Sequence, residues 1–112
     1  MPISVLLKCH DLETTKSFYA EILDFEVIDS DQGTCTVQKE DCTIIFTTEE
    51  LWSGHPKCTG TIYLFINDVD TYYESIKEKA IVLWPLQDMP YGTREFGIKD
   101  YDEYNIAFAQ KA

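Results

Sequence analysis

The sequence predicts an α+β fold built from two tandem βαβββ modules. Two observations carry this prediction: a strand-helix unit occurs twice, and short strand patterns follow each copy. Residues 5–7 form an apolar run before Asp11 and a helical pattern, and residues 63–66 form one before Asp68 and a second helical pattern. A unit repeated at this spacing divides the 112 residues almost in half and sets the architecture.

The first module begins with an apolar strand at 4–9 that leads into Asp11. The Asp11 side chain can cap the free amides of a helix running to about Leu23. The buried stripe of this helix is predicted to be Phe18, Tyr19, Ile22 and Leu23. Turn signals separate three further strands, predicted at 25–28, 34–39 and 42–48.

The second module repeats this order after a connection at 49–59. A strand at 61–66 leads into Asp68, which caps the second helix. Its apolar positions follow helical spacing and are Val69, Tyr72, Tyr73, Ile76 and Ala80. Three more strands are predicted at 81–84, 93–99 and 105–109.

Composition argues against several classes of partner. Twenty acidic and nine basic residues give a formal charge of −11, which repels nucleic acid and anionic lipid and attracts a cationic ligand. The chain shows no membrane-length apolar run and no signal-peptide pattern, so we expect a cytoplasmic protein. Four cysteines without a C-x-x-C pair are expected to be reduced and structural: Cys9, Cys35, Cys42 and Cys58.

The modules resemble the vicinal oxygen chelate superfamily of glyoxalase I, extradiol dioxygenases and bleomycin resistance proteins. The run Met89-Pro90-Tyr91-Gly92-Thr93-Arg94-Glu95-Phe96 is similar to the M-P-W/Y-G-x-R-E-F run of the bleomycin resistance branch. The resemblance covers the whole chain. It implies one domain over residues 1–112, with module one at about 1–56 and module two at about 57–112, whose curved mixed sheets surround a cup.

Metalloenzymes of this superfamily place one ligand on each of four strands. The corresponding positions here are Ser4, Ile45, Thr61 and Ala107. Divalent transition metals prefer imidazole, carboxylate or thiolate donors, so the sequence predicts no metal and no cofactor. A displaced site using His10 and His55 requires the loop around His55 to fold inward.

Alternation along the strands places hydroxyl and aromatic side chains inside the cup. The candidate ligand-binding residues are Tyr63, Phe65, Trp84, Met89, Tyr91, Glu95 and Trp52. Two of them have structural alternatives: Trp84 fits a core position equally well, and Glu95 fits an ion pair with Arg94 or Lys8.

The turn after residue 99 departs from the superfamily's D-P-D-G pattern. Tyr101 stands in place of the proline, and Glu103 in place of the glycine. A retained positive-φ turn would cost about 1 kcal/mol with a non-glycine residue, and the alternative is a rebuilt turn.

The favoured function is metal-free binding of a small molecule, similar to bleomycin resistance proteins that sequester a cationic aromatic antibiotic. The resemblance also implies a homodimer. The alternatives are a glyoxalase-like or dioxygenase-like metalloenzyme with a displaced metal site, and an accessory protein that responds to another small molecule.

Overall fold

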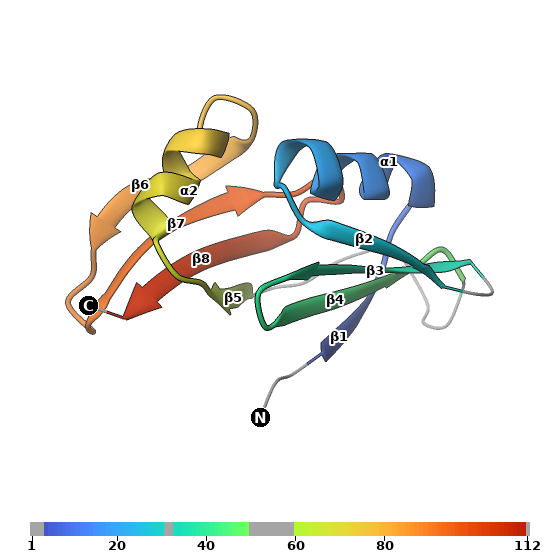
Figure 1. The fold of residues 1–112 in the computed structure, drawn as a ribbon, viewed down its shortest axis with the longest axis horizontal. Coiled ribbons are helices and arrows are strands. Elements are labelled where there is room, and N and C mark those ends of the chain that lie inside the picture. The colour runs from blue at the N-terminus through green and yellow to red at the C-terminus, as the bar shows by residue number, and fades with distance from the viewer. Residues whose placement is uncertain (1–3, 31–32, 50–59, 112) are drawn as a thin grey trace. The chain divides into compact units, whose positions relative to one another are not determined.

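The computed structural model describes residues 4–30, 33–49 and 60–111. The chain falls into two compact units, Met1–Lys57 and Cys58–Ala112. Each unit holds a four-stranded mixed sheet with helical residues packed on one face, in the order βαβββ (Figure 1). The predicted α+β class with two tandem modules is therefore confirmed, while one domain over 1–112 stays a prediction. No helix in the described ranges is long and apolar enough to span a membrane.

The first unit has the strand order β1-β4-β3-β2, with β1 parallel to β4 and the other pairs antiparallel. Its elements are β1 (Ser4–Lys8), α1 (Leu12–Ser17), η1 (Phe18–Ile22), β2 (Glu26–Ser30), β3 (Thr34–Lys39) and β4 (Cys42–Thr47). Asp11 caps α1 as predicted, because its side chain accepts a hydrogen bond from the Thr14 amide at 3.3 Å.

The first helix differs from the prediction in its second half, where η1 forms a π-helical turn. The fully buried residues are Thr15, Tyr19 and Leu23, which are spaced by four. A π turn has more residues per turn than an α-helix, so residues spaced by four lie on the same face of the helix. Tyr19 packs against Phe46 at a ring distance of 5.1 Å. Of the predicted stripe, Phe18 and Ile22 are only half-buried.

The second unit has the strand order β5-β8-β7-β6, with β5 parallel to β8. Its elements are β5 (Thr61–Phe65), α2 (Val69–Ile76), β6 (Ile81–Asp88), β7 (Thr93–Lys99) and β8 (Asn105–Lys111). Two predicted boundaries were wrong by more than two residues. The helix ends before Ala80, and β6 continues through Pro85, which an edge strand tolerates because one row of its amides needs no partner.

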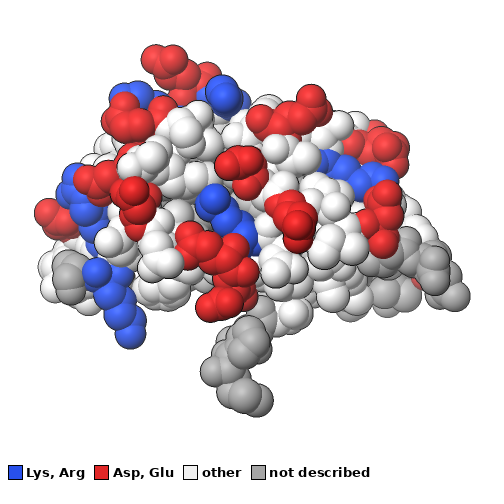
Figure 2. Space-filling view, in the orientation of Figure 1, with Lys and Arg blue, Asp and Glu red and all other residues white. Residues whose placement is uncertain are grey.

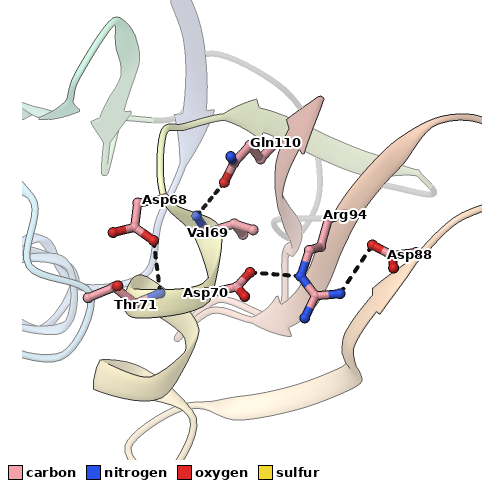
Figure 3. Close-up of polar contacts among 7 residues, drawn as sticks. All are labelled: Asp68, Val69, Asp70, Thr71, Asp88, Arg94 and Gln110. Atoms are coloured by element: carbon pink, nitrogen blue, oxygen red, sulfur yellow. Dashed lines mark hydrogen bonds and ion pairs between the residues drawn. The ribbon is translucent and has the colours of Figure 1, made fainter. Parts of the chain in front are cut away.

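Polar contacts fix the start of α2 on its sheet (Figure 3). The Val69 amide donates to Gln110 Oε1 on β8 at 2.7 Å. The Arg94 side chain on β7 reaches Asp70 at 2.7 Å and Asp88 at 3.1 Å. Beneath the helix, the Tyr72 ring packs on Phe108 at a centroid distance of 4.8 Å. Arg94, Phe108 and Gln110 therefore mark the helix side of the second sheet.

The turn between β7 and β8 keeps its positive φ despite Glu103, which has φ +68°. The Asp100 side chain accepts hydrogen bonds from the amides of Asp102 at 3.0 Å and Tyr104 at 2.8 Å. These buried bonds stabilise the turn, so the backbone keeps the positive-φ geometry with a strained non-glycine residue at position 103.

Glu103→Gly is expected to raise the free energy of unfolding by up to about 1 kcal/mol, because glycine adopts positive φ without a Cβ clash. Urea unfolding measures the change. Glu103→Ala is the control, since it removes the 3.7 Å ion pair with Lys99 but retains the strain, and it should change stability little. A glycine variant no more stable than the alanine variant would contradict the strain.

Candidate functional site: the aromatic face

The second sheet carries a set of aromatic side chains on the side opposite α2. Successive strand residues point to opposite faces, so Glu95 and Gly97 lie opposite to Arg94 and Phe96. Strand register places Gly97 beside Ala107 and then Tyr63, and places Glu95 beside Ala109 and then Phe65. We call this side, with Tyr63, Phe65, Trp84, Glu95, Gly97, Ala107 and Ala109, the aromatic face.

Glu95 is the polar centre of the aromatic face. Its side chain is fully buried and accepts three hydrogen bonds. Thr93 Oγ1 donates to Oε1 at 2.7 Å, the Tyr91 hydroxyl donates to Oε1 at 3.0 Å, and Trp84 Nε1 donates to Oε2 at 3.3 Å. The predicted alternative of an Arg94 ion pair is wrong, because Arg94 lies on the helix side and binds Asp70 and Asp88.

Gly97 supplies the space in which the Trp84 ring lies. A Cβ atom on Gly97 would stand 2.5 Å from three carbons of the indole ring, closer than real contacts allow. Register shifts on either side of Trp84 in β6 bring it opposite Gly97. The half-buried indole therefore lies over the β7 backbone with its N–H directed at Glu95.

Large rings around this centre remain accessible. Tyr63 is 42% exposed, Phe65 is 49% exposed and Tyr91 is 60% exposed, whereas the small floor residues Ala107 and Ala109 are fully buried. The Tyr63 and Tyr91 hydroxyls lie 3.4 Å apart. Rings standing above a floor of small residues, with a few polar groups among them, are typical of small-molecule sites.

The Tyr91 hydroxyl keeps its proton at neutral pH and so acts as a donor to Glu95. Its hydrogen bond with Tyr63, together with desolvation and the bond to Glu95, raises the pKa of Tyr91 above its usual value. Tyr91 lies in the turn between β6 and β7, where Gly92 adopts φ +91°.

The structure brings together Tyr63, Trp84, Tyr91 and Glu95 through hydrogen bonds, and the register adds Phe65 to the same face. Met89 lies half-buried in the turn, where its amide donates to the Thr93 carbonyl at 2.7 Å. Trp52 and His55 lie outside the described residues. Sequence reasoning missed Thr93 and Gly97; a glycine two positions after Glu95 in a strand was the available signal for close packing.

The four superfamily metal positions lie on the sides of the sheets away from the helices. Ser4 pairs with Thr43 and Ile45 pairs with Leu6, so the two predicted positions in the first sheet are not direct neighbours. In the second sheet Thr61 pairs with Asn105, and Ala107 pairs with Tyr63. Within the described ranges, no group of three His, Cys, Asp or Glu side chains is arranged to hold a metal ion.

Two βαβββ modules in tandem, one with an aromatic face, define the structural class of this protein. The sequence profile of the Glyoxalase/Bleomycin resistance protein/Dioxygenase superfamily matches residues 3–108. The chain belongs to this superfamily.

Solved structures with the same fold cover nearly the whole chain. TioX from Micromonospora sp. ML1 has a TM-score of 0.80 and 16% sequence identity, over 100% of this chain and 99% of that one. A member of the glyoxalase/bleomycin resistance protein/dioxygenase superfamily from Sphaerobacter thermophilus DSM 20745 has a TM-score of 0.79 and 21% identity, over 99% and 97% of the two chains. At these identities the likeness shows the fold alone. No curated protein sequence matches the chain significantly.

Proposed function

We propose that the aromatic face binds a flat, positively charged aromatic molecule and sequesters it without chemical change, as the resemblance to bleomycin resistance proteins implies. One observation carries this proposal. Tyr63, Phe65 and Tyr91 expose their rings around a half-buried Trp84, on the sheet side that α2 does not cover. Exposed aromatic groups of this kind mark binding surfaces more often than isolated surface residues do.

Ring stacking and charge both favour such a ligand. An aromatic pair or a cation over a ring contributes about 0.5–2 kcal/mol where water is excluded. The formal charge of −11 adds long-range attraction that weakens as salt rises. On the face of the molecule drawn in Figure 2, acidic side chains outnumber basic ones and are spread over the surface.

Trp84→Ala is expected to weaken binding of a bleomycin-class compound about tenfold at any salt concentration, because stacking area is lost. Calorimetric titration of wild type and variant measures the change. Tyr101→Ala is the matched control, since Tyr101 is 48% exposed but lies in the turn between β7 and β8. Equal losses in both variants, or binding of neutral and anionic aromatics alone, would contradict the proposal.

We further propose that the protein works without a metal or cofactor, as a cytoplasmic homodimer. Its edge strands support pairing of chains, because β2 and β6 each end a sheet and unpaired sheet edges attract another chain. Native mass spectrometry of the purified protein should show a metal-free species of twice the 13.0 kDa chain mass. A monomer at micromolar concentration would refute the dimer, and stoichiometric zinc or iron surviving dialysis would refute the metal-free state.

A further inference from the structure

Glu95 is a buried carboxyl group whose three hydrogen-bond partners are all uncharged. They are the hydroxyls of Tyr91 and Thr93 and the indole N–H of Trp84. No lysine or arginine in the described ranges forms an ion pair with it. A carboxylate can accept about four hydrogen bonds, and a cationic donor forms a stronger hydrogen bond with it than a neutral donor does. Glu95 therefore retains both acceptor capacity and an unmet preference for positive charge.

Tyr91 is the partner that can leave. Its side chain is 60% exposed, so little packing holds it over Glu95. The turn that carries it is closed by backbone hydrogen bonds, from the Met89 amide to the Thr93 carbonyl and from the Gly92 amide to the Met89 carbonyl. These bonds do not involve the Tyr91 ring. The ring can therefore turn into solvent while the turn persists, and its 3.4 Å hydroxyl contact with Tyr63 is then replaced by water.

The other two partners are fixed by the sheet. Thr93 belongs to β7, two residues before Glu95 and on the same side. Trp84 belongs to β6 and lies against the Gly97 backbone. A change at Glu95 Oε1 can therefore occur at Tyr91 alone, while Oε2 stays bound to the indole.

We propose that a bound ligand replaces the Tyr91 hydroxyl with its own cationic N–H group, which donates to Glu95 Oε1. In the free protein Tyr91 thus occupies the position of the ligand's charged group. The ligand class is an amidinium, guanidinium or ammonium attached to a flat aromatic ring, and it rests on the function proposed above. A charge-assisted hydrogen bond is stronger than the neutral one it replaces, so the exchange favours a cation over its neutral analogue.

Two probes that differ in charge but share their shape test this exchange: naphthalene-2-carboxamidine, a cation, and naphthalene-2-carboxamide, its neutral analogue. Wild-type protein is expected to bind the amidine about tenfold more tightly than the amide in calorimetric titrations. Glu95→Gln should reduce this preference to less than about twofold, because a neutral side-chain amide cannot form the charge-assisted bond. Tyr91→Phe removes the competing hydroxyl and should strengthen amidine binding about threefold.

A second readout follows Trp84 directly. Its indole N–H signal in a nitrogen-proton correlation spectrum is assigned by recording Trp52→Phe protein, which leaves Trp84 as the one tryptophan. Saturating amidine should shift this signal in wild type more than the amide does, because the Glu95 charge distribution changes. The difference between the two probes should disappear in Glu95→Gln.

The outcomes separate this inference from the proposed function. Equal wild-type affinity for both probes, or an amidine affinity lowered by Tyr91→Phe, would overturn the exchange while aromatic binding survives. Tyr91 is exposed, so this variant tests the exchange even where Glu95→Gln fails to fold. Failure of both probes to bind wild-type protein at millimolar concentration would refute the proposed function and the exchange with it.

Discussion

Replacing Gly97 with alanine is expected to displace the Trp84 indole and lower the free energy of unfolding by about 2 kcal/mol, the scale of an overpacked core position. The added Cβ would lie 2.5 Å from the ring carbons Cη2, Cζ2 and Cζ3. Backbone in the middle of a sheet cannot retreat, so the ring moves and loses its 3.3 Å hydrogen bond to Glu95. Urea unfolding measures the stability, and the tryptophan emission of Trp52→Phe protein reports the ring position.

A double-mutant cycle identifies the contact as the cause. In a Trp84→Ala background the Cβ meets no ring, and Gly97→Ala should be neutral or stabilise by about 0.5–1 kcal/mol, since a strand glycine loses more conformational entropy than alanine. The coupling between the two positions is then about 2–3 kcal/mol. Equal effects of Gly97→Ala in both backgrounds would show that the ring does not lie over Gly97.

Glu95→Ala is expected to destabilise the protein by about 3 kcal/mol. It removes the shared acceptor of Thr93, Trp84 and Tyr91, and a buried donor left unsatisfied costs roughly 1–3 kcal/mol. A cavity in a fully buried site adds to this cost. The exposed Tyr91 hydroxyl can turn to water, so the loss arises mainly from Thr93 and Trp84.

Thr93→Val separates these contributions because it removes one donor and leaves the Glu95 side chain in place. It should cost about 1 kcal/mol by urea unfolding, clearly less than Glu95→Ala. If Glu95→Ala costs no more than Thr93→Val, the carboxyl group does not organise the aromatic face.

Period-two alternation explains why much of the fold could be predicted from the sequence. The bounds of β3 and β7 match the predicted strands. Strand alternation was expected to place Tyr63 and Phe65 on the same face, and the observed register agrees. The errors came from tertiary effects. Helix α2 ends at Ile76 and does not reach Ala80 as predicted. The two register shifts in β6 depend on how Trp84 packs on β7.

In the candidate site, too, local sequence predicted some residues, whereas tertiary contacts determined the rest. The run from Met89 to Phe96 indicated Tyr91 and Glu95 as site residues, but their hydrogen bond depends on a turn that folds the hydroxyl back over β7. The role of Gly97 depends on a residue of the neighbouring strand, and no pattern within β7 specifies that Trp84 lies opposite it.

Methyl NMR tests most directly whether ligands bind the aromatic face. Ala107 and Ala109 lie on this face of β8. Ile106 of β8 and Ile98 of β7 pair with each other, and strand alternation places both on the helix side. Titration with a flat aromatic cation is predicted to shift the two alanine methyl signals and leave those of Ile98 and Ile106 nearly unchanged. Shifts confined to the isoleucines, or no shifts at saturating ligand, would show that ligands do not bind the aromatic face.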